Sequence, residues 1–307
     1  MTEEKRSRWR LGAAAALLAL SPLPLRAQST SGEVTGRVVD AQGSVVPGAT
    51  VTARNEGTGL VRTATTSAAG EYLISQLPPG TYGLSAELSG FRRAVVKGVA
   101  VNVGTRQTLN FELALGSMAE ALEVTADAAL IETTKSDLGG VVTPHEIQNL
   151  PLLNRTFAGL SIVMPEARPV GNFDPTKTRI GNFAMSGGDG RQLDVNVDGG
   201  DNKDNVVGSL IQNFAYESIQ EFQVLQHRWT AESGRSVGGV VNVVSKSGTN
   251  DLHGSAFGTH RSEATRTRDF FEKQRQRADP TFEKAGFSRQ EFGGSLGGPI
   301  RRDQLFF

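Results

Sequence analysis

Apolar and polar side chains alternate with a period of two along much of residues 31–115. The alternation is clear at residues 34–38 and returns around Val51. It then recurs over residues 82–88, 99–103 and 109–115. Repeated alternation between turn signals such as Pro47-Gly48 is typical of antiparallel strands with one buried face. We therefore predict a small β-sandwich over residues 31–115.

The next part of the chain has a mixed pattern. Residues 116–130 have few bulky side chains, and we predict a linker that contains one strand. Residues 131–250 combine short helical segments, ended by prolines, with alternating strands, which indicates an α+β unit. The predicted elements are helices over residues 145–151 and 155–163, a strand over 193–198, and a turn or short helix leading into a strand over 216–225.

A glycine-rich bend precedes an apolar strand near residue 240. Gly234, Gly238 and Gly239 come before residues 240–244, which are mostly valine. Glycine inside a strand pattern marks a bend or the close approach of another backbone. The apolar run is too short to span a membrane as a helix. An alternating strand of different character begins directly afterwards, at Leu252.

Strand patterns continue to the last residue. Residues 287–300 place Phe292, Leu296 and Ile300 on one face. Another strand begins near the last residue, after a short polar turn. Membrane β-strands need only about 9–11 residues each, and a single such strand leaves a weak signal in the sequence. The intervening residues 261–284 contain charges of both signs, and we expect a long exposed loop there.

The N-terminus combines a basic segment with a short apolar run. Basic residues precede the apolar residues 11–20, and Pro22 and Pro24 follow. The run is about half the roughly 20 residues that a spanning helix needs, so we predict a cleaved secretory signal over residues 1–27. We expect cleavage after Ala27, and the signal implies export from the cytoplasm.

The amino-acid composition restricts the classes of protein to which this chain can belong. Hydrophobic residues make up 38% and charged residues 21% of the chain, which suits a folded polar protein. The 36 glycines, against 15 Phe, 3 Tyr and 2 Trp, favour turn-rich β structure. The formal net charge is zero, so we expect no nucleic-acid partner. Cysteine is absent, which excludes disulfides and thiolate metal sites.

One segment resembles a calcium-binding loop. Residues 194–199 match the first half of an EF-hand, with Asp194 and Asp198 at spaced positions. Position 12 of that loop is Asn205, where a bidentate glutamate is expected, and Val195 and Val197 alternate as in a strand. A strand followed by a turn is therefore the favoured interpretation.

Other candidate chemistry is sparse. The four histidines, His145, His227, His253 and His260, are too widely separated for one zinc motif. No Gly-x-Ser-x-Gly elbow is present, and the paired glycines are not followed by the residues of a phosphate-binding loop. We therefore expect no catalytic residue, no cofactor, no metal site and no enzymatic activity.

Two phrases resemble the carboxypeptidase-regulatory-like module, a prealbumin-type sandwich with a carbohydrate-binding-like fold. They are residues 36–49, which contain the Pro47-Gly48 turn, and residues 70–82. In the second phrase a Pro-Gly turn leads into Tyr82, whose ring we expect to fill the core. The resemblance implies no peptidase centre.

Residues 231–260 resemble the last strand of the plug and the first barrel strand of TonB-dependent outer-membrane receptors of the Oar-like type. Residues 185–188 and 197–201 agree with the same plug. The resemblance implies a mainly β chain: a prealbumin-like sandwich, an α+β plug, and the first strands of an incomplete transmembrane β-barrel. The implied domains are a signal peptide (1–27), the sandwich (31–115), a linker (116–130), the plug (131–250) and the barrel start (251–307).

The resemblance also suggests a coupling segment. Leu122, Glu123, Val124, Thr125 and Ala126 lie between the sandwich and the plug, where these receptors have their TonB box. An unconstrained extended strand can add to the exposed sheet edge of a partner through backbone hydrogen bonds. The alternative is an ordinary linker strand.

The family implies active uptake of a solute across the outer membrane. The partners would be the inner-membrane protein TonB, outer-membrane lipid, and a solute such as a glycan or a peptide. The barrel would lie in the outer membrane and the N-terminal domains in the periplasm. The alternative is a secreted surface-binding or adhesion protein built on the sandwich. A barrel cannot leave an unpaired edge in lipid, so we expect an N-terminal fragment or a truncated reading frame.

Overall fold

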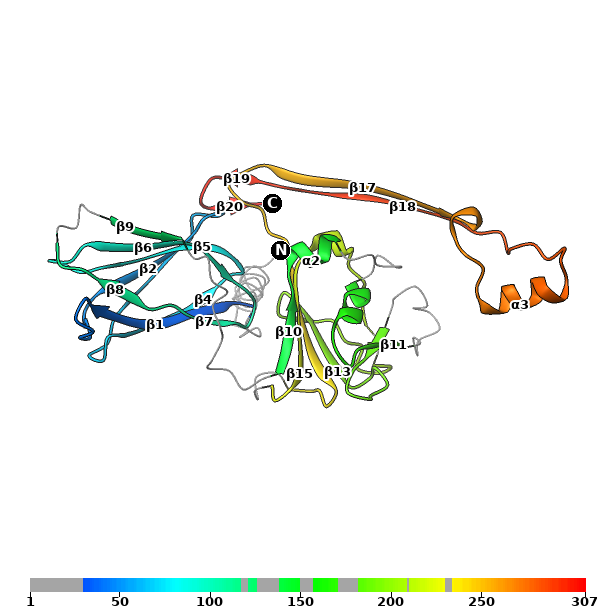
Figure 1. The fold of residues 1–307 in the computed structure, drawn as a ribbon, viewed down its shortest axis with the longest axis horizontal. Helices are drawn as coiled ribbons and strands as arrows, with labels where there is room; N and C mark the ends of the chain where they lie inside the picture. Colours follow the sequence, from blue (N-terminus) through cyan, green and yellow to red (C-terminus); the bar gives the residue numbers. More distant parts are fainter. Residues whose placement is uncertain are drawn as a thin grey trace, which may run out of the picture.

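The computed structural model describes residues 30–116, 121–125, 138–149, 157–170, 182–208, 210–229 and 234–307. Figure 1 shows three parts: a β-sandwich, a central sheet with short helices, and a long two-stranded hairpin. Within the described ranges, no helix is both long and apolar enough to cross a membrane. The predicted signal peptide lies outside the described residues.

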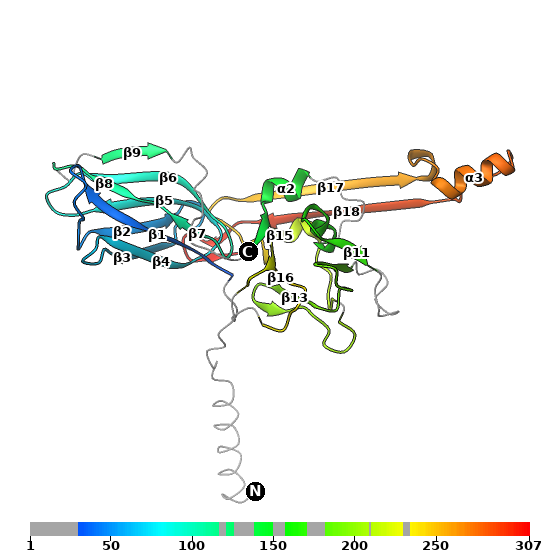
Figure 2. The same cartoon turned by 60° about the horizontal axis from the view of Figure 1, so that its bottom comes forward.

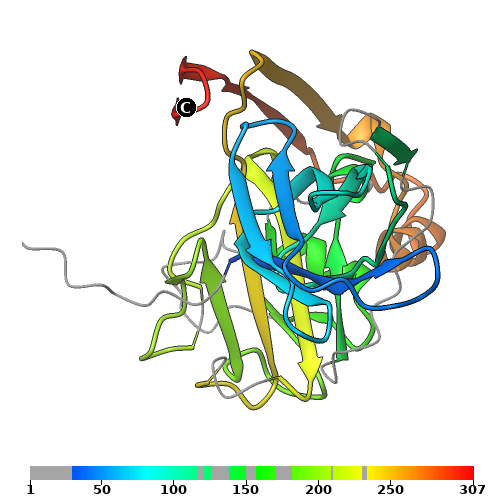
Figure 3. The same ribbon diagram turned by 90° about the vertical axis from the view of Figure 1, so that its left-hand side faces the viewer.

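Two sheets pack face to face in the sandwich, as the alternating pattern predicts. The first sheet contains β1 (Gly32–Asp40), β4 (Glu71–Leu77), β7 (Arg106–Thr108) and β8 (Phe111–Leu113). The second has the order β3-β2-β5-β6-β9 and contains β2 (Thr50–Asn55), β3 (Val61–Thr65), β5 (Gly80–Glu87), β6 (Arg93–Val101) and β9 (Ala121–Thr125). Figure 3 looks from the sandwich side, with these strands in front of the central sheet. The predicted strand at residues 99–103 overlaps the end of the longer β6, which stops at Val101.

Two buried tyrosines and a glycine explain how the two sheets close. Tyr82 is fully buried, as predicted, and its hydroxyl donates to the carbonyl oxygen of Pro78 at 2.8 Å. The hydroxyl of Tyr72 donates to the Leu109 carbonyl oxygen at 2.7 Å, and burial raises the pKa of Tyr72. A Cβ atom at Gly36 would lie 1.8 Å from that same Leu109 oxygen. Only glycine therefore lets β1 approach this segment.

The central unit is a five-stranded sheet with short helices. Its order is β10-β15-β16-β13-β14, and only the β13–β16 pair within this sheet is parallel. The elements are β10 (Leu138–Val142), α2 (Pro144–Asn149), η1 (Phe157–Val163), β11 (Arg168–Val170), β12 (Asn182–Ala184), β13 (Leu193–Val197), β14 (Gly200–Asp201), η3 (Tyr216–Ser218), β15 (Ile219–His227) and β16 (Gly239–Ser245). One face packs into a core that includes Phe183, Phe222 and Val241.

The sequence-based expectations for this unit agree with most of these elements. The predicted strand at 193–198 is β13, and residues 216–225 form η3 followed by β15. The second predicted helix is a 3₁₀ helix. The alternation of apolar and polar residues does not predict β10 or the β11–β12 hairpin, because these strands are short or rich in glycine.

The C-terminal part is a long antiparallel hairpin with a helical insertion. It comprises β17 (His253–Ser262), η4 (Glu263–Thr265), α3 (Phe270–Ala278) and β18 (Ser288–Gly297), followed by β19 (Pro299–Arg301) and β20 (Leu305–Phe306). The expectation of a simple loop over residues 261–284 is therefore incomplete, because this stretch contains η4 and α3. It is largely exposed, as expected.

The two faces of the hairpin carry different side chains: Phe292 and Leu296 share one face with His260 and Gln290, and Ser255 and Ser295 share the other with Phe257. Phe292 and Leu296 share a face, are 86% and 66% exposed, and pair opposite glycines of β17. On the other face the hydroxyls of Ser255 and Ser295 lie 2.9 Å apart. Ile300 belongs to β19 and not to β18, which ends at Gly297, so its place on the face of Phe292 stays a prediction.

We expect residues 31–115 to fold alone, because their own strands close the sandwich core. The isolated piece should show a β-type circular dichroism spectrum and melt cooperatively. Gly36→Ala should lower its unfolding free energy by about 1–3 kcal/mol or more, because the new Cβ has no room. Gly83→Ala is the matched control, since the nearest atom to its Cβ would be 3.8 Å away. A coil-like spectrum, or equal melting of the two variants, would contradict this account.

Candidate coupling segment and domain interface

The candidate coupling segment is a strand at the edge of the sandwich. Leu122 to Thr125 lie within β9, and Ala126 lies outside the described residues. β9 pairs with β6 in parallel, with Val95 opposite Glu123 and Val96 opposite Val124. Figure 2 shows β9 alongside β6, at the end of the sheet. The expectation of an unconstrained linker strand is therefore wrong for these residues: the strand is extended, but it is already paired.

The other end of β6 leads to the contact between the sandwich and the central sheet. The turn between β6 and β7 places Val103 against β15, where it is fully buried. The Val103 N–H donates to Oε2 of Glu221 at 2.7 Å, and Nε2 of Gln223 donates to the Val103 carbonyl oxygen at 3.0 Å. Two side chains of one strand thus satisfy both backbone groups of one residue. We call this contact the Val103 clasp.

A neighbouring glycine permits the clasp. Gly104 has φ of +62°, in the left-handed region that favours glycine. A Cβ atom there would lie 2.5 Å from Nε2 of Gln223. The backbone can therefore approach the Gln223 amide only because residue 104 has no side chain.

Gln223 is also the first member of a polar row across the central sheet. Its Oε1 accepts a hydrogen bond from Nδ2 of Asn242 at 3.1 Å. Nδ2 of Asn196 lies 3.5 Å from Oδ1 of Asn242 and donates to Oδ2 of Asp194 at 3.1 Å. Gln223, Asn242 and Asn196 are directly opposite one another in the strand register. Cross-strand amides of this kind hold the register of buried strands.

Polar residues between apolar ones in these strands are the sequence signal for the row, although the period-two alternation alone does not predict it. In β13, β15 and β16 single polar residues interrupt apolar ones, as in Leu-Asp-Val-Asn-Val and Val-Val-Asn-Val-Val. Such an interruption in an otherwise buried strand indicates a partner on the same face. It does not indicate which partner, because the register between β13 and β16 is a tertiary feature.

The surroundings of Asp198 distinguish a calcium-binding EF-hand loop from a strand followed by a turn. Asp198 accepts hydrogen bonds from the Ser245 N–H at 2.8 Å and from the Ser245 hydroxyl at 2.6 Å. Its φ of +50° places it in the turn between β13 and β14. The favoured interpretation of a strand and turn is therefore confirmed. Across the described ranges no group of three or more His, Asp or Glu side chains could hold a metal ion.

Glu221 is the titratable group of the clasp. Only 2% of its surface is exposed, and desolvation raises its pKa from 4.5 to about 7, although the Val103 N–H acts in the opposite direction. The pKa of Glu221 in the folded chain lies above its value in the unfolded chain. The contribution of Glu221 to the unfolding free energy is therefore fully present below about pH 4.5. It is lost as the pH rises through about 7.

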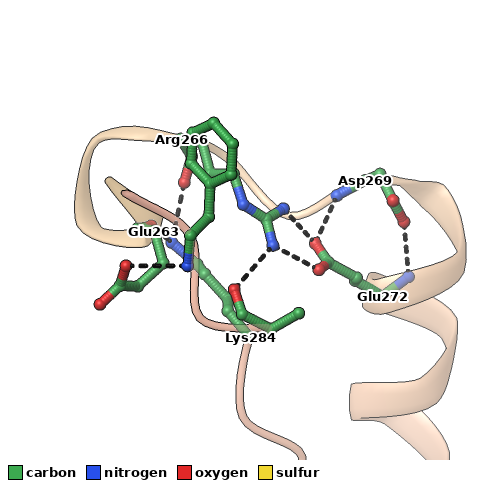
Figure 4. A network of polar contacts seen from close by, with 7 residues as sticks. Glu263, Arg266, Asp269, Glu272 and Lys284 are labelled. Atoms are coloured by element: carbon green, nitrogen blue, oxygen red, sulfur yellow. Dashed lines mark hydrogen bonds and ion pairs between the residues drawn. The ribbon is translucent and has the colours of Figure 1, made fainter. Parts of the chain in front are cut away.

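A second polar network stabilises the insertion in the hairpin. Figure 4 shows the Arg266 guanidinium against Glu272, with distances of 2.7 and 2.6 Å to the two carboxylate oxygens. Hydrogen bonding to Arg266 lowers the pKa of Glu272 to about 2. Asp269 caps α3 by accepting from the Glu272 N–H at 2.7 Å. Nζ of Lys284 donates to the carbonyl oxygens of Glu263 and Arg266, which ties the end of the insertion to its beginning.

The raised pKa of Glu221 predicts a pH-dependent stability. Glu221→Gln keeps an acceptor for the Val103 N–H but removes the charged form. We expect the variant and the wild type to have similar unfolding free energies at pH 5. At pH 8 the variant should be more stable, by up to on the order of 3 kcal/mol.

Denaturant unfolding of the chain at several pH values measures this difference. Glu112→Gln is the matched control, because Glu112 is exposed in the middle of β8. Parallel pH profiles for wild type and Glu221→Gln would contradict the assignment.

Two segments of the chain match known domain families, and one known protein is similar to the chain over most of its length. Residues 33–114 match the carboxypeptidase regulatory-like domain, and residues 244–307 match the outer membrane beta barrel domain. The TonB-dependent transporter Oar of Myxococcus xanthus is 28% identical over 290 residues, which cover 90% of this chain and 26% of the relative. The chain thus spans about a quarter of the length of that transporter.

Two solved structures show weaker likeness. The siderophore receptor PirA from Acinetobacter baumannii is 23% identical, covering 55% of this chain and 23% of that chain, with a TM-score of 0.38. A putative carbohydrate binding protein from Bacteroides uniformis is 22% identical, covering 26% of this chain and 40% of that chain, with a TM-score of 0.23. At such TM-scores nothing about fold or function follows from them.

The sequence and family matches confirm the predicted resemblance and the mainly β fold class. The segment from residue 244 places the protein in the outer membrane, as expected. The curated relative is named as a transporter and not as an enzyme. The chain is therefore homologous to the TonB-dependent transporter Oar, with a carboxypeptidase regulatory-like domain followed by a segment that matches the outer membrane beta barrel domain.

Proposed function

We propose that the chain is the N-terminal part of a transporter that takes up a solute across the outer membrane with energy supplied through TonB. The observation that supports this most is the order of its parts. A sandwich is followed by an extended segment, a central α+β sheet, and a long hairpin. The homologous transporter is matched across this whole order.

In this proposal the central sheet is the plug. The domains are a signal peptide (1–27), the sandwich (31–115), a linker with the coupling segment (116–130), the plug (131–250) and the barrel start (251–307). Phe292 and Leu296 on one face of the hairpin suit lipid, and Ser255 and Ser295 on the other face suit the barrel interior. The plug closes the barrel until TonB acts on the coupling segment.

The protein is not an enzyme in this proposal, and the solute that it takes up is a glycan or a peptide. The alternative of a secreted adhesion protein is weaker, because such a protein has no need of the outer membrane beta barrel sequence at residues 244–307.

The coupling role of residues 122–126 predicts the effect of a proline. Pairing with the sheet edge of the TonB C-terminal domain needs backbone N–H donors. Val124→Pro removes one donor and fixes φ, so it should reduce binding to the TonB C-terminal domain more than Val124→Ala does. A pull-down with wild type and both variants measures this effect, and equal capture of all three would place the TonB box elsewhere.

The proposed signal peptide predicts the mature N-terminus. We expect the apolar segment at residues 11–20 to be removed during export, leaving a first residue near Gln28. Mass spectrometry of the protein exported by a host with two membranes measures the intact mass. A mass that includes Met1 would contradict the assignment.

A further inference from the structure

We propose that β6 sequesters the coupling segment, so that TonB engages it only after β9 has left the sandwich. This inference rests on the proposed function, since it concerns the regulation of the same segment. Five consecutive residues of β9 pair with β6, from Ala121 opposite Arg93 to Thr125 opposite Lys97, without a register shift. The chain's own strand thus occupies the position that a partner strand would take.

The two pairings compete when the partner uses the edge of β9 that faces β6. In a strand the N–H and C=O groups of successive residues point alternately to the two neighbouring strands. While β6 holds one edge, a segment of this length offers a partner only about two or three residues on the other edge. A partner that pairs along the edge facing β6 must displace β6. Release of β9 frees both edges for the partner.

β6 has the features of a strand that tolerates exposure. Arg93 and Lys97 lie at the two ends of the pairing with β9, and Gly98 follows with φ of +75°. Natural edge strands use charged residues and local irregularities to avoid unwanted pairing. The buried core cluster of the sandwich includes residues from Val34 to Leu113. β9 is the last strand of its sheet and pairs there only with β6, so the sheet without β9 would end at β6.

The Val103 clasp keeps the rest of the sandwich in place while β9 leaves. It joins the sandwich to β15 by two hydrogen bonds to a fully buried residue, and β6 runs directly into this turn. Departure of β9 exposes one edge of β6. Departure of the whole sandwich would also expose Val103 and the carboxylate and amide that hold it. Release of the strand alone is the smaller change.

The absence of cysteine allows a direct test by disulfide locking. Val95→Cys with Glu123→Cys places two thiols at directly opposite positions. Neighbouring strands are about 4.8 Å apart, which suits a disulfide. The control pair is Arg93→Cys with Thr125→Cys, four residues out of register and so roughly 13 Å apart along the strand.

We expect the in-register pair to cross-link on oxidation and the control pair to stay reduced. The locked chain should bind the purified TonB C-terminal domain at least tenfold more weakly than the same chain after reduction. Equal or tighter binding by the locked chain would show that TonB adds to the free edge of β9, and failure of the in-register pair to cross-link would show that β9 is not held. Both results overturn sequestration and leave the proposed function standing. Absence of binding by the wild type and the reduced chain overturns the proposed function, and the inference with it.

Discussion

The need to pair backbone N–H and C=O groups at strand edges governs how the parts of this molecule are joined. Buried backbone N–H and C=O groups without hydrogen-bond partners are destabilising, so each strand edge or turn that becomes buried requires a partner. At one end of β6 the partner is the strand β9. At the other end the partners are the side chains of Glu221 and Gln223, which bind both backbone groups of Val103. β6 thus connects the candidate coupling segment to the central sheet.

The central sheet meets this requirement with polar side chains on a buried face. Apolar side chains in place of Gln223, Asn242 and Asn196 would need no hydrogen-bond partner on the neighbouring strand. The amides instead specify which residues lie opposite one another, since each needs a hydrogen-bond partner. Glu221 at the end of this region titrates near neutral pH because it is desolvated. The same residue that holds the sandwich therefore makes the contact sensitive to pH.

Much of the fold followed from the sequence, because period-two alternation is a local signal. The alternation around Val34 and Val51 predicted the sandwich, and Tyr82 was expected in its core. The short strand β10 escaped detection because Gly139 and Gly140 interrupt its pattern. The coupling segment was located by its position, but its pairing with β6 was not predicted, since an edge partner leaves no mark in the segment itself. Likewise nothing near Val103 indicated that β15 would bind its backbone.

Hydrogen exchange of the backbone amides tests the central claim, that β6 and TonB compete for the coupling segment, most directly. In the chain alone, amides of β6 over residues 93–97 that face β9 should exchange slowly, together with those of β9. When the TonB C-terminal domain is added, the account predicts that this protection is lost from β6 and kept by β9. Unchanged protection of β6 in the complex would contradict it.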